Sequence, residues 1–252
     1  MQKKIVVHMY LKNGKAVTGF DGKELLEDGD VMSIAQHYSN NGADELLIFD
    51  LSDDDADHEQ SLNLIRQISR VIDIPMSGGG HIKNLEDVKK LLYAGCQQVF
   101  LNYAKAANIE LTEEVSKRFG KEKIAICTDS FAQLQANKAR VNEYTSRVIL
   151  LCDEVDVRTT ARLVEVPVLP VSTRADRHGL LKLLMLDNIC GVCGDTFSDL
   201  NEDLMAAKLE AKKHGVEINT FESKMSWNEL KLNSDGMIPV VGQDYHCLLY
   251  TS

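Results

Sequence analysis

Residues 45–80, ELLIFDLSDDDADHEQSLNLIRQISRVIDIPMSGGG, contain the pattern that decides the fold. An apolar run at 46–51 is followed by an acidic loop and by residues 58–71, where apolar side chains recur at helical spacing. A second apolar run begins at Ile74. Because both runs are continuously apolar rather than alternating, we expect two strands buried on both faces and joined by a helix.

The same unit recurs along the chain. Apolar runs rich in β-branched residues occupy 4–9, 46–51, 74–77, 98–102, 123–128, 147–152, 167–171 and 189–194. Helical patterns are found at 30–41, 58–71, 84–94, 113–119, 131–140, 158–165, 176–186 and 199–214. Eight βα units in about 215 residues predict an α/β protein with a (β/α)8 barrel. An open doubly wound sheet is the alternative, but the sequence has no G-x-G-x-x-G motif to support it.

Composition excludes several classes of protein. Lys and Arg number 28 against 38 Asp and Glu, and an acidic chain without a basic run is unsuited to nucleic acid or an anionic membrane. No apolar stretch reaches the roughly 18 residues of a membrane span. Six dispersed cysteines do not form a disulfide framework, and the lone pair Cys190 and Cys193 lacks the other two ligands of a structural zinc. We therefore expect a reduced, cytoplasmic protein whose barrel needs no cofactor.

The pattern changes near residue 221. We expect the barrel to occupy residues 1–222 and a polar linker to lead into a second domain at 223–246, where the turn Ser234-Asp235-Gly236 starts a new strand. Fewer than 30 residues remain, too few for a core, so this domain is truncated. The last six residues, CLLYTS (247–252), equal one reading frame of a common transposon-library adaptor. We interpret them as adaptor-derived.

In a barrel, chemistry belongs at the carboxyl ends of the strands. Asp129 follows the fifth predicted strand and serves either as a general acid or base, or as the cap of the next helix. Asp50 ends the second strand, ahead of an acidic stretch at 53–59 that either attracts a cation or is simply solvated. Asn102 ends the fourth.

Two loops have a composition that favours phosphate binding. The glycines that include Gly79 and Gly80 let backbone N–H groups approach a ligand closely, unless they form only a flexible turn. After the seventh strand, Ser172, Thr173 and Arg174 either hold a phosphate through hydroxyls and a guanidinium or cap a helix.

Residues 3–129 resemble a known family, the cyclase subunit of imidazole glycerol phosphate synthase in histidine biosynthesis, and more distantly its sister, the phosphoribosylformimino isomerase. The matching pieces are 12–15, 42–46, 49–50, 78–80, 94–95, 101–102, 118–120 and 129. The resemblance implies acid and base aspartates at the ends of strands one and five, acting on a bisphosphorylated substrate. Asp129 matches the second, and Asp50 and Asn102 match ligand-contacting positions. It also implies a glutaminase subunit as partner; a homo-oligomer is the other possibility.

The chain departs from that family at several positions. Tyr10 stands where the first aspartate belongs, and a phenol, with an ordinary pKa near 10, cannot replace a carboxylate. Thr18 stands where the family has a lysine, and Ser172-Thr173-Arg174 replaces its Ser-Gly-Gly phosphate loop. These departures predict a barrel that binds a phosphorylated ligand or acts as a scaffold, without turnover.

Residues 232–244, LNSDGMIPVVGQD, resemble the opening of phosphoribosyl-AMP cyclohydrolase, the zinc hydrolase of the same pathway. The resemblance implies that zinc binds in a downstream domain that this sequence lacks. We therefore expect a multifunctional histidine-biosynthesis protein whose hydrolytic part is missing here. The alternatives are a working cyclase or isomerase with Asp129 as acid or base, and a purely structural domain.

Overall fold

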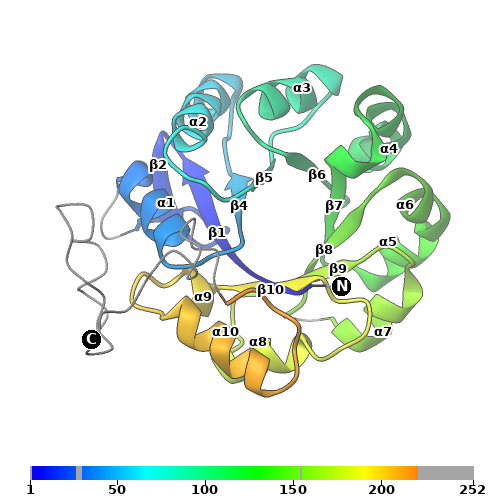
Figure 1. Ribbon diagram of the computed structural model, residues 1–252. Coiled ribbons are helices and arrows are strands. Elements are labelled where there is room, and N and C mark those ends of the chain that lie inside the picture. The colour runs from blue at the N-terminus through cyan, green and yellow to red at the C-terminus, as the bar shows by residue number, and fades with distance from the viewer. Residues whose placement is uncertain (1, 27–29, 154, 221–252) are drawn as a thin grey trace, which may run out of the picture. The chain divides into compact units, whose positions relative to one another are not determined.

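The computed structural model describes residues 2–26, 30–153 and 155–220. The predictions for residues 223–246 and 247–252 lie outside this part of the chain, and the predicted zinc site lies downstream of the sequence; all of these stay predictions. Within it, the predicted (β/α)8 barrel is confirmed. Parallel strands follow one another in chain order around the ring, and the last pairs with the first, Lys4 opposite Gly191 and Val6 opposite Cys193. Figure 1 shows these strands as an inner ring with the helices outside.

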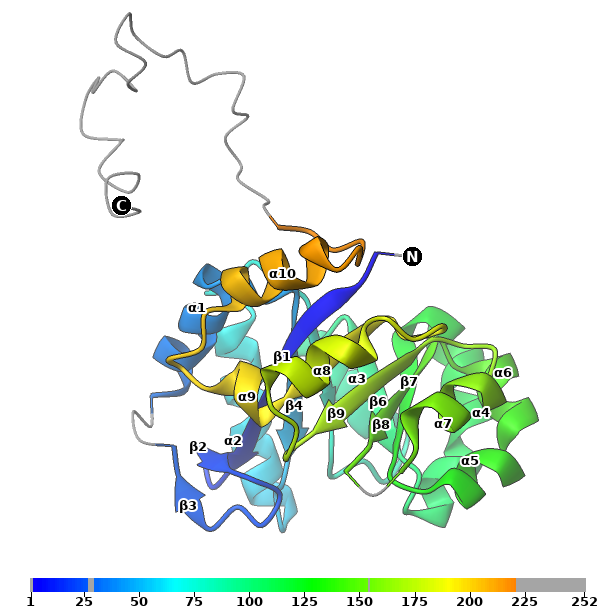
Figure 2. The same ribbon diagram turned by 90° about the horizontal axis from the view of Figure 1, so that it is seen from below.

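The eight barrel strands are β1 (Lys4–Lys12), β4 (Glu45–Asp50), β5 (Met76–Gly79), β6 (Gln98–Asn102), β7 (Ile124–Thr128), β8 (Arg147–Leu151), β9 (Val168–Ser172) and β10 (Gly191–Gly194). Two further strands, β2 (Lys15–Thr18) and β3 (Glu24–Leu25), pair antiparallel beside the end of β1. Figure 2 shows these two strands at the end of the barrel opposite the amino end of β1. Ile218 pairs with Lys3 in an isolated bridge.

The helices are α1 (Val31–Asn40), α2 (Asp55–Ile68), α3 (Leu85–Tyr93), α4 (Ala106–Phe119), α5 (Phe131–Ala136), α6 (Lys138–Tyr144), α7 (Val157–Leu163), α8 (Arg177–Leu183), α9 (Asp195–Ser198) and α10 (Leu204–Lys213), with a short 3-10 turn, η1 (Lys121–Lys123). Side-chain caps define several starts. Asn84, for example, opens α3 in a reciprocal capping box with Asp87.

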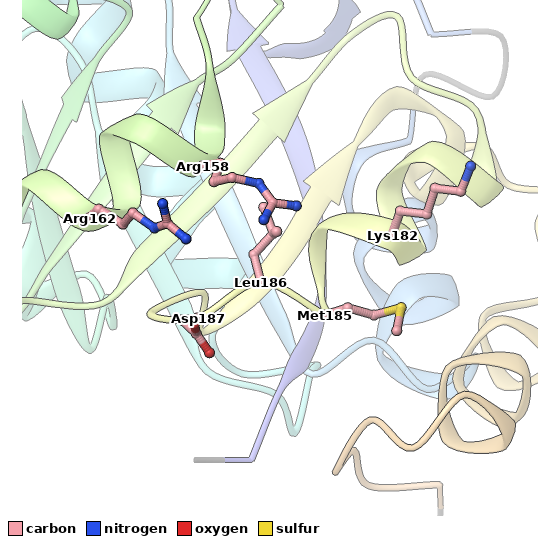
Figure 3. A pocket seen from close by; sticks show the side chains of 6 residues that line it. All are labelled: Arg158, Arg162, Lys182, Met185, Leu186 and Asp187. Carbon is pink, nitrogen blue, oxygen red and sulfur yellow. The ribbon is translucent and has the colours of Figure 1, made fainter.

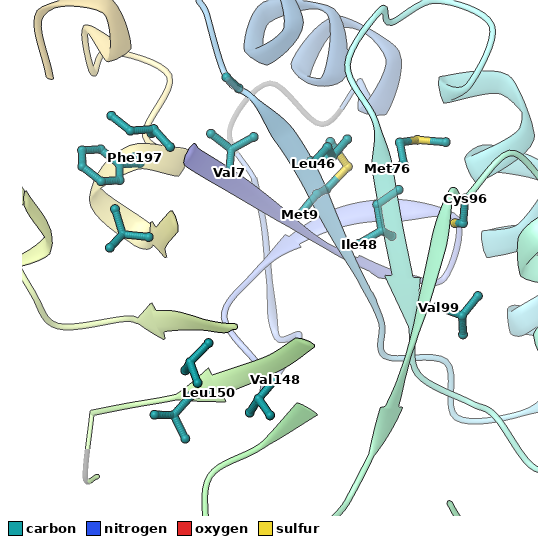
Figure 4. Packing of buried hydrophobic residues seen from close by; sticks show 14 of the residues in the cluster. Val7, Met9, Leu46, Ile48, Met76, Cys96, Val99, Val148, Leu150 and Phe197 are labelled. Carbon is teal, nitrogen blue, oxygen red and sulfur yellow. The ribbon is translucent and has the colours of Figure 1, made fainter. Parts of the chain in front are cut away.

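The apolar core has two layers because successive strand residues point to opposite faces. On β1, Ile5, Val7 and Met9 point outward into the layer between strands and helices, part of which Figure 4 shows. Val6 and Tyr10 point inward, into a second cluster that fills the barrel. The barrel interior is therefore packed rather than hollow, as is usual for eight strands.

Three boundaries differ from the sequence-based prediction for physical reasons. Helix α4 begins at Ala106, not 113, because its first turns bury polar Asn108 and Thr112, which hides the apolar period; Thr112 bonds the Tyr103 hydroxyl at 2.9 Å. The predicted helix 131–140 is two helices that meet at Asn137. Strand β5 runs on to Gly79, which pairs with Phe49, so two of the three glycines belong to the sheet rather than to a turn.

Candidate functional site

A cavity of about 390 Å³ opens at the carboxyl ends of β4 to β7. Five of the seven predicted site residues line this cavity, hereafter the mouth pocket: Asp50, Gly79, Gly80, Asn102 and Asp129. The barrel topology brings them together, because they follow neighbouring parallel strands whose ends share one rim. The two others, Ser172 and Thr173, do not line it.

The glycines are required by close approach of other backbone and side-chain atoms. A Cβ on Gly79 would lie 2.3 Å from the Phe100 ring and 2.4 Å from the Phe100 carbonyl oxygen. Gly80 has φ +112°, and a Cβ there would lie 2.0 Å from the Asp50 carbonyl oxygen. Any larger residue would push these segments apart, so the pattern Gly79-Gly80 fixes the wall of the pocket.

Asp50 is buried and hydrogen-bonded rather than free. Its Oδ2 lies 2.5 Å from His58 Nδ1, and its Oδ1 accepts from both the backbone N–H, at 3.1 Å, and the hydroxyl of Ser52. His58 is itself buried, and its Nε2 has no partner among the described residues. Asp50 therefore belongs to the pocket lining, but its carboxylate is buried and both of its oxygens are engaged, one by the imidazole of His58 and the other by Ser52.

His81 lies at the rim directly after the glycines, in the left-handed region at φ +50°. Its Nδ1 is 3.1 Å from the Ser52 carbonyl oxygen and its Nε2 is 2.7 Å from Asp55 Oδ1. His58 was considered only as part of the acidic stretch 53–59, and His81 was given no role from the sequence. The available signal was their placement, one in the first turns of α2 and the other next to the glycines, beside an acidic loop.

Asp129 is exposed at the pocket, and its carboxylate makes no hydrogen bond or ion pair with the residues the structure describes. The cap of α5 is the next residue, Ser130, whose hydroxyl accepts from the N–H of Gln133 at 3.3 Å. The helix-cap alternative for Asp129 is thus taken by its neighbour. Asn102 lies nearby, with its Oδ1 accepting from the N–H of Ala104 at 2.9 Å.

Tyr10, at the position where the resemblance implies a catalytic aspartate, does not line the mouth pocket. Its ring is 3% exposed and packs against Phe20 and Phe49, with centroids 4.7 and 5.4 Å away. Its hydroxyl has no partner within the described chain. Burial, followed by the negative charge of Asp195, raises the pKa of Tyr10 well above its usual value, so the phenol stays protonated at neutral pH.

Beside Tyr10, His8 is the centre of a hydrogen-bond chain that the sequence pattern did not indicate. Its Nε2 is 3.0 Å from Asp195 Oδ1, and its Nδ1 is 3.3 Å from Cys193 Sγ and 3.1 Å from Ser198 Oγ. Burial raises the pKa of the Cys193 thiol, which is therefore not a nucleophile at neutral pH. This chain ties α9 to β1 and β10.

The loops after β8 and β9 are joined by hydrogen bonds between their polar groups. The hydroxyls of Ser172 and Thr173 each donate to Asp153 at 2.5 Å, and the N–H of Thr173 donates to the same carboxylate at 3.1 Å. Burial acts to raise the pKa of Asp153, but these hydrogen bonds outweigh it and lower the pKa. The cap of α8 is Asp176. A phosphate role for Ser172 and Thr173 stays a prediction, and such a ligand would compete with Asp153.

A second cavity, of about 370 Å³, lies on the outer wall between α7 and α8 (Figure 3). It is lined by Arg158 and Arg162 from α7 and by Leu186 and Asp187, with Lys182 on the α8 side. These residues were not predicted as a site. Across residues 2–26, 30–153 and 155–220, the structure has no cluster of His, Cys, Asp or Glu suited to a metal, and no helix long and apolar enough to cross a membrane.

Comparison with known proteins agrees with the geometry. A family model described as "Histidine biosynthesis protein" matches residues 4–187. The chain belongs to the histidine biosynthesis protein family. The predicted relationship to this pathway is thereby confirmed, and the match covers β1 to β9, including every element that lines the mouth pocket.

Relatives of this histidine biosynthesis protein include subunits named "Imidazole glycerol phosphate synthase subunit HisF". That of Flavobacterium psychrophilum is 33% identical over 130 residues, 52% of each chain. That of Helicobacter hepaticus is 34% identical over 132 residues, 51% of each. That of Haemophilus influenzae is 32% identical over 162 residues, 64% of this chain and 60% of the relative. The chain thus spans about half the length of the curated relatives it matches.

Proposed function

We propose that this chain is a ligand-binding barrel of histidine biosynthesis that holds a phosphorylated small molecule in the mouth pocket and does not turn it over. The observation that carries the proposal is Tyr10, because a buried, protonated phenol replaces one member of an acid–base pair. Asp129 then stands alone as the accessible carboxylate without a partner among the described residues that line the pocket. The pocket therefore lacks the second aspartate of the acid–base pair that the resemblance implies.

The family match and the form of the pocket support a phosphorylated ligand. The backbone of Gly80 lies at the rim, and Lys12 and Lys105 belong to the same lining, with the Lys12 ammonium 3.0 Å from Asp53 Oδ2. A glycine turn with nearby cations favours an oxyanion. In the complete protein we propose that the barrel precedes a phosphoribosyl-AMP cyclohydrolase domain, which would hold zinc downstream of this sequence, and that the whole protein acts in the cytoplasm.

A second candidate is an active cyclase or isomerase in which Asp129 alone acts as acid or base. The observation that favours it is the free Asp129 carboxylate, together with relatives that are synthase subunits. In that case a glutaminase subunit is the partner that we propose, with a homo-oligomer as the alternative.

One experiment separates the candidates. Calorimetry measures binding of ribose 5-phosphate to the 252-residue chain. A parallel assay measures formation of imidazole glycerol phosphate from the bisphosphorylated substrate of the cyclase, with ammonium supplied directly. We expect binding without turnover, and loss of binding in Gly79→Val, whose fold is checked by circular dichroism. Turnover that disappears in Asp129→Asn but survives in Asp187→Asn, a matched change at the outer-wall cavity, would establish the second candidate. Absence of both binding and turnover in the unaltered chain would overturn the ligand-binding barrel and the cyclase.

A further inference from the structure

Two histidines stack at the rim of the mouth pocket, each held by its own carboxylate. The rings of His58 and His81 lie 4.9 Å apart between centroids and 27° from parallel. Asp50 contacts His58, whereas Asp55 contacts His81. Both rings are buried, with side chains 3% and 8% exposed. The groups that face each ring nitrogen therefore indicate which nitrogens carry a proton.

The partners of His81 require two ring protons. Nδ1 faces the carbonyl oxygen of Ser52 and Nε2 faces the carboxylate of Asp55, and neither oxygen has a proton to give. Asp55 remains ionised, because the hydrogen bond from His81, followed by that from Lys83, lowers its pKa to about 2. A neutral imidazole has a single N–H and would lose one of these two contacts. The geometry is that of an imidazolium.

His58 needs only one proton. Its Nδ1 donates to Asp50, and its Nε2 has no partner among the described residues. The stacked pair thus contains one cation and one neutral ring, which avoids the repulsion of two stacked cations. The charged and titratable groups around His81 are Asp55 and His58 from α2, Asp50 behind His58, and Lys83 on its own loop.

The charge of His81 decides whether the lining of the mouth pocket is neutral or net negative. The cations on the lining are Lys12, Lys105 and, when protonated, His81. The anions on the lining are Asp50, Asp53 and Asp129. With His81 protonated the two sets are equal in number, and without that proton the lining is net negative.

We propose that His81 determines the specificity of this pocket: as an imidazolium it clamps the turn after β5 to the loop after β4 and admits an oxyanion, and as a neutral ring it disfavours one. This inference rests on the proposed ligand-binding function. It follows that affinity for an oxyanion falls as pH rises, because loss of the proton removes a positive charge and weakens the contact that neutralises Asp55. One unit charge a few ångströms from the ligand changes affinity roughly five- to tenfold.

The test uses sulfate, a dianion whose charge does not change across the range, titrated into the 252-residue chain between about pH 6 and about pH 8.5. We expect affinity to fall roughly five- to tenfold over this range. In His81→Asn, which tolerates the left-handed backbone but carries no charge, affinity is low and independent of pH. The matched control is His178→Asn, an exposed histidine on α8, which keeps the original profile.

Two further measurements separate a failure of this inference from a failure of the proposed function. Asp55→Asn moves the fall in affinity to lower pH, whereas Glu59→Gln, on the same helix but paired with Lys90, does not. Nitrogen-15 spectra of the imidazoles show both ring nitrogens of His81 protonated at about pH 7 and one of His58. A flat pH profile shared by the unaltered chain and His81→Asn, or a neutral His81 in the spectra, would overturn the inference. Absence of ribose 5-phosphate binding would instead remove the proposed function.

Discussion

The two ends of the barrel differ in how completely their buried polar groups are hydrogen-bonded. At the amino ends of the strands, Glu45 on β4 and Arg147 on β8 form a buried, two-pronged ion pair. Ser77 donates to Glu45 at 2.7 Å, and Gln98 accepts from Arg147 at 2.5 Å. At the carboxyl ends, His58 Nε2 and the Tyr10 hydroxyl are buried without partners in the described chain.

This difference separates stability from function. Groups that satisfy one another completely hold the strands in register but leave nothing for a ligand. Buried groups with spare hydrogen-bonding capacity lower stability, and at the mouth the residues that carry them do not themselves line the pocket. Barrels conventionally place binding at the carboxyl ends, and the contrast here assigns the mouth to recognition and the opposite end to stability.

The largest effect is expected from Glu45→Gln. The change leaves the guanidinium of Arg147, a residue only 9% exposed, without its countercharge. Removing one partner of a buried ion pair costs about 3–5 kcal/mol in free energy of unfolding. Urea unfolding measures this loss, and Glu59→Gln, which breaks the exposed pair with Lys90, costs less than about 1 kcal/mol. Equal losses in the two variants would contradict the stabilising role of the buried end.

We expect loss of stability at low pH to arise at the same end of the barrel, the amino ends of the strands. Burial acts to raise the pKa of Glu45, but the charge and hydrogen bonds of Arg147, helped by Lys4, outweigh it and lower the pKa to about 2. A carboxyl with a depressed pKa stabilises the fold fully above its unfolded pKa of 4.5 and loses that contribution as pH falls toward 2. We expect the urea midpoint to fall steeply below about pH 4.5.

The control for acid unfolding lies at the mouth. Asp55 also has a pKa lowered to about 2, by His81 and then Lys83, but it is fully exposed and its contribution is screened by water. Glu45→Gln should therefore flatten the acid limb, whereas Asp55→Asn should leave it nearly unchanged. The opposite ranking would place the acid-sensitive contact at the mouth instead.

The sequence predicted the fold and five residues of the pocket lining, because both depend on local patterns. Continuous apolar runs identify barrel strands, and the ends of parallel strands identify the rim, which was enough for Asp50, Asn102 and Asp129. Nothing local pairs Glu45 with Arg147, which are 102 residues apart. Likewise, the stacking of His58 on His81 needs the turn after β5 to lie against α2. Contacts between distant segments were the part that pattern alone did not reveal.

The smallest effect is expected from Ser172→Ala, which tests whether the ligand extends from the mouth pocket to the loop after β9. The hydroxyl of Ser172 donates to Asp153 and accepts from the N–H groups of Arg174 and Ala175, at 3.2 and 2.9 Å. Because Thr173 still donates to Asp153, we expect a loss of only about 1 kcal/mol in free energy of unfolding. Calorimetry with ribose 5-phosphate then decides the role of the loop. Unchanged affinity confines the ligand to the wall formed by β4 to β7, whereas weakened affinity means that the ligand phosphate displaces Asp153 and takes its hydroxyl donors.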